Sequence, residues 1–205
     1  MDKEKFLDKA YGLDSAHQTR AHYDDWSASY DDEIGRNGYA TPARIAAALA
    51  HVCDDLAAPV LDFGCGTGLS GVALSQRGFL TIDGIDLSQD MITQAGDKAC
   101  YRDLHLIEPD APLNLEASGH KSIVACGAIG AGAAPLSVFD SLMQGLPRGG
   151  FFALSFNDHS LEDPIYEAKL DSYVQTKTAR LLHREHGDHL PGINLGCVVY
   201  VIEKT

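Results

Sequence analysis

Short apolar runs alternate, along the middle of the chain, with segments whose apolar residues recur every three or four positions. The apolar runs predict five strands, at 59–63, 80–87, 104–107, 122–126 and 151–156. The helical spacing predicts four helices beside them, from Thr41 to Leu56, over about 69–77, after Ser88, and from Leu136 to Leu146. This alternation is typical of a mainly parallel sheet that is covered by helices on both faces.

The C-terminal third follows a different pattern. After a helix predicted at about 164–178, the segments 179–185 and 197–204 have the character of strands and are separated only by residues 186–196. This connection has no room for a crossover helix, so the two strands should be antiparallel. The sheet is therefore expected to end in an antiparallel pair.

The length and the even composition of the chain indicate a single folding unit. Its 205 residues suffice for one α/β domain with a full core, and they contain no repeat and no linker-like stretch. We therefore expect one domain over 1–205, in which a polar segment with many aromatic residues at 1–40 precedes a sheet core at 41–205.

The charge and the cysteines restrict the partners and the compartment. With 16 Lys and Arg against 29 Asp and Glu, the net charge is −13, which is unsuited to binding duplex DNA or structured RNA. The N-terminus resembles neither a signal peptide nor a transit peptide, and no apolar run is long enough to span a membrane. Five cysteines without a C-x-x-C spacing favour free thiols in a reducing cytoplasm and argue against structural zinc.

The sequence DFGCGTGLSG, at 62–71, joins the first predicted strand to the following helix. Its glycines fit two spacings, G-x-G-x-x-G over 66–71 and D-x-G-x-G-x-G over 62–68. Such a loop directs backbone amides at a ligand, and Asp86, 22 residues after Gly64, is placed to accept hydrogen bonds from ribose hydroxyls. Both spacings therefore predict a ligand that contains adenosine.

Asp62 distinguishes between these two interpretations. In a dinucleotide site the glycine loop receives a pyrophosphate, which a carboxylate directly before the first glycine would repel. A ligand with an ammonium group and no phosphate would instead be attracted by that carboxylate. Gly71 is then a small residue needed for packing of the helix on the sheet.

The segment VLDFGCGTG resembles the first motif of class I S-adenosylmethionine-dependent methyltransferases, and IDGIDLSQDM resembles their second. The segments YDDWSASYDD and PRGGFFALSF also fit this family. The patterns Y-x-x-W-S-x-x-Y-D, ACGAIGAG and Y-E-A are similar to those of the methyltransferase-like group of the Williams–Beuren syndrome region. The resemblance covers nearly the whole chain. It implies a Rossmann-like, seven-stranded sheet with an antiparallel final strand, S-adenosylmethionine as cofactor and S-adenosylhomocysteine as product.

The resemblance implies roles for the residues of the two motifs. Those of the glycine turn and its backbone contacts are Gly64, Cys65, Gly66, Thr67 and Gly68. Asp62 would hold the ammonium of the methionine part through water, and Asp86 would bind the ribose. Leu87 and Met91 would flank the adenine, although Met91 is equally compatible with the core of its helix.

Two further positions follow from the third and fourth strands. Family members place an acid after the third strand to accept from the adenine N6, and Asp110, followed by Ala111, fits this role better than Glu108 does. Cys126 and Gly127 end the fourth strand at the topological switch point, where open α/β sheets bind their ligands.

Tyr23, Trp26 and Tyr30 are spaced three or four residues apart in the N-terminal segment. Aromatic residues at this spacing are most often packing residues of a helix. In related enzymes, however, such a segment folds over the cofactor, where aromatic faces meet the sulfonium. We therefore expect residues 1–40 to form a helical lid over the cofactor, with these three side chains facing it.

The histidines provide one candidate base and no metal site. His159 lies just after the fifth strand, from which it could accept a proton from an acceptor hydroxyl or amine. His183, His186 and His189 lie in the C-terminal strand region, but the first two, three residues apart on a strand, point to opposite faces. We therefore expect no metal.

These features predict an S-adenosylmethionine-dependent methyltransferase that acts on a small-molecule acceptor in the cytoplasm. The sequence lacks the tetrapeptide of amino-group nucleic-acid methylases and the proline-cysteine of cytosine C5 methylases, which agrees with the acidic charge in excluding nucleic acid. Membrane partners are not expected. The alternatives are an NAD(P)-dependent oxidoreductase and a non-catalytic protein that binds S-adenosylmethionine. The acceptor, its accepting atom and the oligomeric state remain open at this point.

Overall fold

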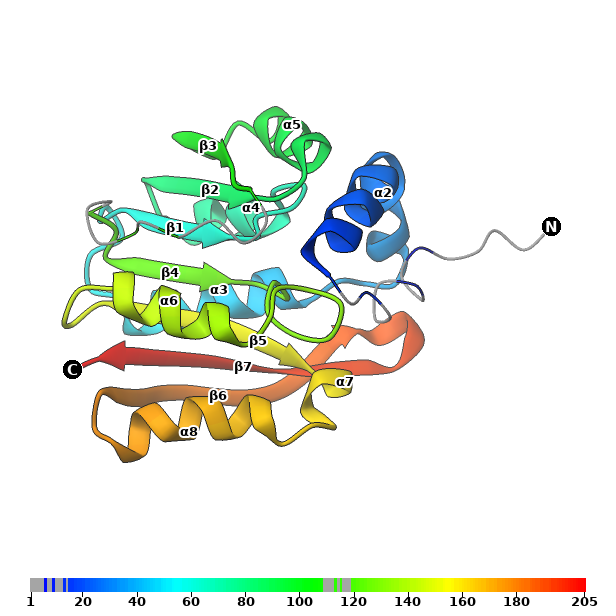
Figure 1. The fold of residues 1–205 in the computed structure, drawn as a ribbon. Coiled ribbons are helices and arrows are strands. Elements are labelled where there is room, and N and C mark those ends of the chain that lie inside the picture. Colours follow the sequence, from blue (N-terminus) through cyan, green and yellow to red (C-terminus); the bar gives the residue numbers. More distant parts are fainter. Residues whose placement is uncertain are drawn as a thin grey trace.

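The computed structural model describes residues 6, 9, 13, 15–108, 113, 115 and 119–205. A seven-stranded sheet in the order β3-β2-β1-β4-β5-β7-β6 forms its centre (Figure 1). The strands are β1 (Val60–Phe63), β2 (Ile82–Asp86), β3 (Asp103–Leu106), β4 (Ser122–Ala125), β5 (Phe151–Asn157), β6 (Ala179–Leu190) and β7 (Leu195–Lys204). The helices are α2 (Ala16–Arg36), α3 (Thr41–Val52), α4 (Leu69–Gln76), α5 (Gln89–Asp97), α6 (Ser137–Gly145), α7 (Asp158–Leu161), α8 (Ile165–Gln175) and the short 3-10 helix η1 (Pro191–Ile193).

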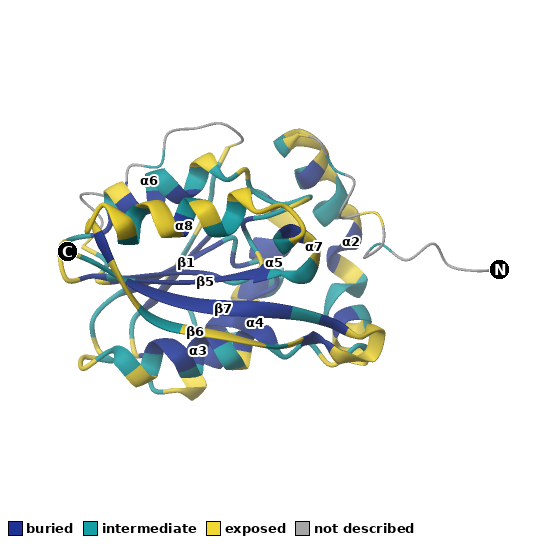
Figure 2. Ribbon diagram, turned by 90° about the horizontal axis from the view of Figure 1, so that it is seen from below, coloured by how far each residue is buried: buried dark blue, intermediate teal, exposed yellow. Residues whose placement is uncertain are grey.

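The strand directions confirm the expected fold class. Strands β1 to β5 pair in parallel, whereas β7 is antiparallel to both β5 and β6, between which it lies. The last strand of the chain is thus inserted into the sheet against the direction of its neighbours. This placement buries β7 almost completely and leaves β6 at the edge (Figure 2).

Helices cover both faces of the sheet because the side chains of each strand alternate between two cores. On one face, Phe139 of α6 and Leu170 of α8 pack with residues such as Phe152 and Tyr200. On the other face, helices α3 and α4 bury their apolar residues against the alternate positions of β5 and β7. Figure 2 shows the sheet as a buried layer between the two sets of helices.

Several predicted boundaries differ from the structure. Helix α3 ends at Val52 because Cys53 is already extended, so Leu56 lies beyond the helix. Strands β6 and β7 are longer than expected and continue through most of residues 186–196, leaving only the turn of η1 between them. A register shift between Asp188 and Leu190 accompanies this longer hairpin, and His189 lies within it.

Helix α2 lies at the end of the sheet where strands β1, β2, β4 and β5 finish (Figure 1). Its Trp26 and Ile34 form a third apolar cluster with Leu190 and Leu195 of the β6–β7 hairpin. The hairpin thus supports the N-terminal helix from below, although the two segments are about as far apart in the sequence as the chain allows.

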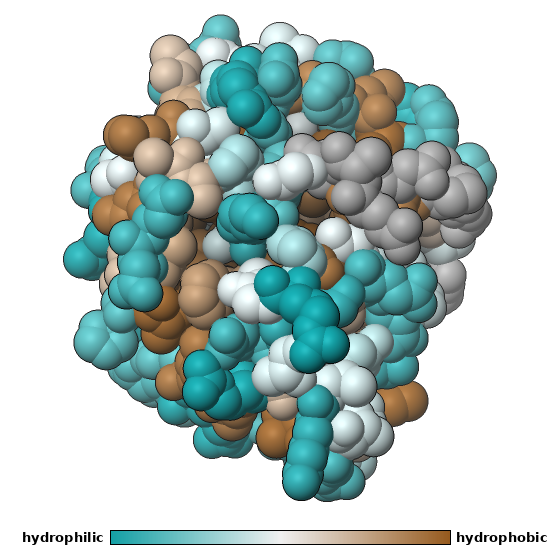
Figure 3. All heavy atoms as spheres, turned by 90° about the vertical axis from the view of Figure 1, so that its left-hand side faces the viewer, coloured by the Kyte–Doolittle hydropathy of each residue, from teal (hydrophilic) through white to brown (hydrophobic). Residues whose placement is uncertain are grey.

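The opposite end of the sheet, where these strands begin, shows hydrophilic side chains with apolar ones scattered among them (Figure 3). Within the part of the chain that the structure describes, no helix combines the length and apolar character that crossing a membrane requires. All five cysteines are free thiols.

Candidate functional site

The glycine turn after β1 has the backbone conformation that its sequence predicts. Gly64 has φ +66°, and a β-carbon placed on it would lie 2.5 Å from the Cβ of Ala128. Gly68 has φ +92° at the residue that begins α4. Side chains at these two positions would be strained or would clash, so the turn requires glycine at both.

The amides of this turn donate within the protein. Gly64 and Cys65 donate to the carbonyl of Ile85, at 2.8 and 3.1 Å, and Gly66 donates to Asp86 Oδ2 at 2.8 Å. A pyrophosphate site needs such amides free to bind its oxygens. With these three amides engaged, one of them by a carboxylate, the geometry disfavours a dinucleotide and agrees with the interpretation drawn from Asp62.

Asp62 lies behind the turn. It is fully buried, and its Oδ2 accepts from Ser70 Oγ at 2.6 Å and from the Tyr101 hydroxyl at 2.7 Å. Burial raises the pKa of Asp62 to about 6. Its other oxygen, Oδ1, is buried and has no hydrogen-bond partner in the described part of the chain, so a water-mediated ligand contact would satisfy it.

The structure confirms that Gly71 is needed as a small residue for packing. A β-carbon there would lie 2.3 Å from the Tyr101 ring, whose hydroxyl accepts from the Gly71 amide at 3.1 Å. Tyr101 therefore connects Asp62 to the first turn of α4. Sequence reasoning did not identify Tyr101, because this residue lies within the loop between α5 and β3, which has no motif.

A cavity beside the glycine turn, here called the main cavity, lies between α2 and the carboxyl ends of the strands. Nine of the predicted residues line it, namely Tyr23, Tyr30, Gly64, Gly66, Asp86, Leu87, Met91, Cys126 and Gly127. Unpredicted lining residues include Arg20, Ser88 and Ile107. The glycine turn, the acid after β2 and the end of β4 are thus brought to one cavity, as expected for parallel strands.

Asp86 connects the glycine turn to α5. Its Oδ2 accepts from Gly66, and its Oδ1 accepts from the Ser88 amide at 2.9 Å, while burial raises the pKa of its carboxyl. Each carboxylate oxygen has a second lone pair, so the carboxylate retains acceptor capacity toward the cavity. Met91 is 1% exposed and is therefore part of the core, and because it also lines the cavity it remains a candidate to flank the adenine.

A second cavity, here called the aromatic cavity, adjoins the first. It shares Tyr23, Tyr30, Cys126, Gly127 and Ala133 with the main cavity. Its remaining lining residues are Trp26, Ile34, Tyr39, Ala131, Asn157, His189 and Leu190.

Trp26 was expected to face the cofactor, but its position in the structure does not agree with this expectation. Trp26 does not line the main cavity. It is 1% exposed, packs in the cluster with Ile34 and the hairpin, and donates from Nε1 to Glu33 at 3.0 Å. This face of α2 turns toward the β6–β7 hairpin, whereas Tyr23 and Tyr30 reach the main cavity.

Three other predicted residues of the turn lie away from the main cavity. Cys65 and Thr67 line a small cavity on the other side of the turn, and Thr67 Oγ1 donates to Asp31 of α2 at 2.5 Å. Gly68 contributes the start of α4 and lines neither cavity. Of the adenine candidates, Asp110 and Ala111 lie outside the described residues, whereas Glu108 is described and pairs with Arg20 at 3.2 Å.

Acidic residues of α2 fasten this helix to the core. Asp24 accepts from Ser88 Oγ at 2.5 Å, and Asp31 accepts from Thr67 Oγ1 and, at 2.6 Å, from Lys98 Nζ. Sequence reasoning missed this role. The sequence YDDWSASYDD contained the signal, because Asp24 and Asp31 are seven residues apart and therefore lie on one face of a helix.

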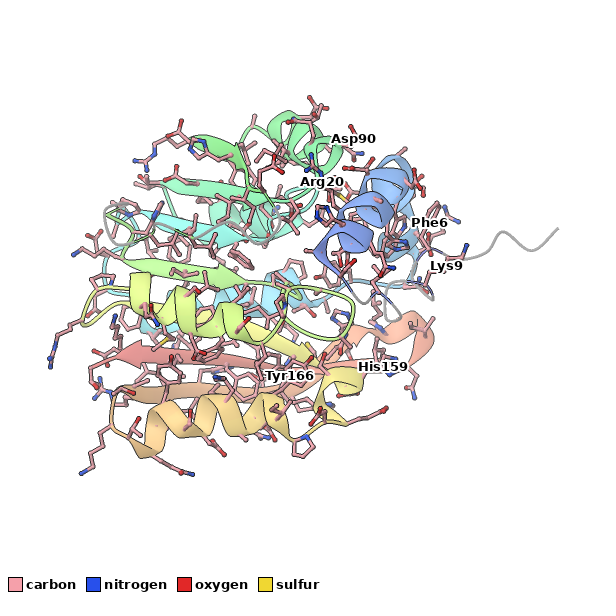
Figure 4. The ribbon with its side chains drawn as sticks, in the orientation of Figure 1. Phe6, Lys9, Arg20, Asp90, His159 and Tyr166 are labelled. Carbon is pink, nitrogen blue, oxygen red and sulfur yellow. The ribbon has the colours of Figure 1, made fainter. Side chains whose placement is uncertain are left out.

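His159 is wrongly placed to be the base. It lies on α7 with its side chain 48% exposed, its Nδ1 is 3.7 Å from Glu162, and it lines neither cavity (Figure 4). Helix α7 starts directly after β5 and carries the side chain outward. Among the described residues, no group of three or more His, Cys, Asp or Glu side chains is arranged to hold a metal ion.

Comparisons with known proteins bear on the family. A family model described as a methyltransferase domain matches residues 60–150. Human methyltransferase-like protein 27 is 29% identical over 177 residues, which are 81% of this chain and 70% of that protein. The 18S rRNA (guanine(1575)-N(7))-methyltransferase of Saccharomyces cerevisiae is 27% identical over 128 residues, which are 56% of this chain and 46% of the yeast protein.

A solved structure shares the fold. It is an S-adenosylmethionine-dependent methyltransferase from Geobacter sulfurreducens in complex with S-adenosylhomocysteine, with a TM-score of 0.59 and 14% identity, covering 80% of this chain and 90% of that one. The matched domain, the relatives and the sheet topology lead to one conclusion: this chain contains a methyltransferase domain and has the fold of the class I S-adenosylmethionine-dependent methyltransferases.

Proposed function

We propose that this enzyme transfers the methyl group of S-adenosylmethionine to a small-molecule acceptor, with the cofactor in the main cavity and the acceptor in the aromatic cavity. The observation that carries the proposal is the wall common to the two cavities, formed by Tyr23, Tyr30 and the end of β4. Two ligands in these cavities would meet at that wall, which methyl transfer requires.

The main cavity suits the cofactor in its chemistry. Asp86 offers acceptor oxygens for ribose hydroxyls, and Leu87, Met91 and Ile107 provide apolar surface for the adenine. The methionine part then lies toward Gly64, where the unpartnered Oδ1 of Asp62 would attract the ammonium through water. Glu108 and Asp110 both remain candidates for the adenine amino group.

We propose that α2, with the rest of residues 1–40, is a lid within a single domain. Its Arg20, which lines the main cavity, pairs with Glu108 at the end of β3 (Figure 4). Its Asp24 and Asp31 bind the first turns of α5 and α4. A helix held on its acidic face above the cavity excludes water from the reacting groups.

The charge distribution supports a small acceptor and disfavours nucleic acid. The described residues that line the aromatic cavity include no Lys, Arg, Asp or Glu, and the net charge of the chain is −13. A phosphate backbone needs positive side chains around the site. One relative is named for an rRNA guanine, but a net charge of −13 repels a phosphate backbone. The five free cysteines suit the reducing cytoplasm, the location proposed here.

The cofactor supplies a methyl group already activated by its sulfonium. The protein therefore contributes mainly alignment of the acceptor with that group and exclusion of water. This division of labour explains why no catalytic dyad is evident around the main cavity.

The test combines binding and transfer. Calorimetry should show that S-adenosylhomocysteine binds and NAD does not. Incubation with radiolabelled S-adenosylmethionine should label the small-metabolite fraction of a cell extract and leave total RNA unlabelled. Asp86→Asn, which weakens ribose binding, should reduce the labelling, whereas Asp90→Asn on the exposed side of α5 should not. Labelling confined to RNA would refute the small-molecule acceptor.

A further inference from the structure

We propose that His189 is the general base of the reaction and that the aromatic cavity accepts a neutral aromatic compound through its hydroxyl group. This inference rests on the proposed function and names both the substrate class and the residue that receives the proton. The main reason for choosing His189 as the base is its position. His189 lines the aromatic cavity, whereas His159 does not.

His189 is fixed at one nitrogen and open at the other. The residue is 8% exposed, and its Nδ1 lies 2.7 Å from Thr41 Oγ1. Among the described residues, the fully buried polar side-chain atoms without a partner are His22 Nε2 and Asp62 Oδ1. His189 Nε2 makes no hydrogen bond in the described part of the chain, yet it is not one of these fully buried atoms, so it is accessible. Because His189 lines the aromatic cavity, we infer that Nε2 is reached from that cavity.

The surroundings of Thr41 orient the imidazole. Thr41 is fully buried, and its Oγ1 also lies 3.2 Å from Cys197 Sγ, which accepts from Arg44 Nη1 at 3.0 Å. The Cys197 thiol is directed at the Asp188 carbonyl, at 3.9 Å, and this leaves its sulfur to accept from Thr41. We therefore assign the Thr41 hydroxyl as donor to the sulfur and as acceptor from His189 Nδ1–H. The imidazole tautomer so fixed presents the lone pair of Nε2 to the cavity.

The imidazole is neutral at neutral pH. Burial lowers the pKa of His189 to about 4, with Arg44 and His159 acting in the same direction and Asp158 opposing them. A neutral imidazole is the form that accepts a proton. A weak base suffices, because an acceptor hydroxyl becomes strongly acidic as its oxygen bonds to the methyl carbon.

The cavity walls define the acceptor. Tyr23, Tyr30 and Tyr39 supply aromatic faces and edges, and the Tyr39 ring meets His189 edge-on at 5.2 Å between centroids. Asn157 is the lining amide, and the lining residues that the structure describes include no carboxylate, ammonium or guanidinium group. A charged acceptor would therefore meet no opposite protein charge in these walls, whereas a neutral ring stacks favourably on them.

The proposed step transfers one methyl group and one proton. The acceptor oxygen forms a bond to the methyl carbon, the carbon–sulfur bond breaks, and its electron pair stays on sulfur. The hydroxyl proton passes to His189 Nε2. The imidazolium so formed has a low pKa in this site and returns its proton to solvent.

A first experiment detects the acceptor at His189 without turnover. The ring signals of the histidines are followed by NMR in the complex with S-adenosylhomocysteine, while phenol, benzoate or benzylamine is added. Phenol should shift the His189 signal, assigned with the variant His189→Gln, and leave that of His159 in place. A response to benzoate or benzylamine and none to phenol would overturn the assigned substrate class.

A second experiment measures transfer from labelled S-adenosylmethionine to a panel of neutral phenols. His189→Gln should reduce kcat by about 100-fold or more, as loss of a general base does, with the Kd for S-adenosylhomocysteine unchanged. The matched control His159→Gln should keep full activity. Full activity in His189→Gln would refute the base, and binding of S-adenosylhomocysteine with no phenol methylated would refute the acceptor class.

Thr41 provides a second variant that preserves shape. Thr41→Val removes the partner of Nδ1 and should lower kcat with little change in KM, while Thr41→Ser should restore it. Equal loss in both variants would contradict the positioning role. A wild-type protein that binds no S-adenosylhomocysteine would overturn the proposed function, and this inference with it.

Discussion

At the scale of single residues, the site depends on a few positions with little freedom. Gly64 lies against Ala128 with a positive φ, and Asp86 bonds to both the turn after β1 and the start of α5. Asp62 supports the same turn from behind through Ser70 and Tyr101. Side-chain size decides the first of these positions, and charge decides the other two.

Gly64 lies so close to Ala128 that a side chain at position 64 should destabilise the protein, and a smaller residue at position 128 should relieve this effect. Gly64→Ala should destabilise the protein by about 2 to 4 kcal/mol, which combines the cost of the positive φ with overpacking. Gly149→Ala, at φ +74° with nothing within 4 Å, is the matched control for the backbone cost alone. Adding Ala128→Gly should recover the steric part. Equal denaturation midpoints for the two single variants would contradict the clash.

Asp62 predicts a pH dependence of cofactor binding. Its pKa of about 6 lies above the value of an unfolded chain, so its protonated form stabilises the free protein and this contribution is lost as the pH rises through about 6. An ammonium favours the ionised carboxylate, so affinity for S-adenosylhomocysteine should increase over the same interval.

Calorimetric titrations at several pH values on either side of that pKa measure this effect. Asp62→Asn should flatten the increase, and Asp90→Asn should retain it. The same increase in Asp62→Asn as in the wild type would show that Asp62 does not act on the cofactor.

At the scale of elements, α2 is held by polar contacts as much as by apolar packing. Four of its 21 residues are buried, and Trp26 and Ile34 rest on the β6–β7 hairpin. Its aspartates bind residues that belong to the cofactor motifs themselves. Opening of this helix would therefore break contacts to the turn after β1 and to α5 together.

Asp31 is predicted to control how long the cofactor stays bound. Asp31→Ala removes the contacts to Thr67 and Lys98 and should accelerate dissociation of S-adenosylhomocysteine by about tenfold, the equivalent of one charge-assisted hydrogen bond. Stopped-flow release and hydrogen exchange of α2 measure the effect. Asp32→Ala, at an exposed position of the same helix, is the control. Indistinguishable rates for the two variants would rule out a latch at Asp31.

At the scale of the whole molecule, topology and charge act together. The strands β1, β2, β4 and β5 end on one side of the sheet, and α2 and the hairpin enclose the two cavities there (Figure 1). The chain has a net charge of −13, whereas the described residues that line the aromatic cavity include no Lys, Arg, Asp or Glu. This combination supports the proposed uncharged acceptor and a cationic cofactor.

This charge predicts the absence of RNA binding. A fluorescent RNA hairpin should show no change in anisotropy up to about 50 µM protein at about 0.1 M salt, a range in which basic proteins bind non-specifically. A protein with a basic RNA-binding domain is the positive control. Micromolar binding that weakens with salt would contradict the prediction.

Much of the fold and part of the site follow from the sequence. Strand positions, the antiparallel ending and the residues at the ends of β1, β2 and β4 were predicted because they depend on local periodicity and on the rule that parallel strands end together. Trp26 and His159 were misjudged because the direction of a side chain depends on which neighbour its helix meets. Asp24 and Asp31 were missed because their partners lie far away in the sequence.

The sequence by itself determined the elements, their order along the chain and the doubly covered sheet, and it predicts a turn that binds adenosine and favours an ammonium over a pyrophosphate. These properties arise from neighbouring residues and from the spacing of glycines and acids. Only the tertiary structure decided which polar groups line the aromatic cavity, since His189 reaches it through a hairpin that is longer than predicted. Packing between distant segments makes that choice, and packing is not encoded in any local pattern.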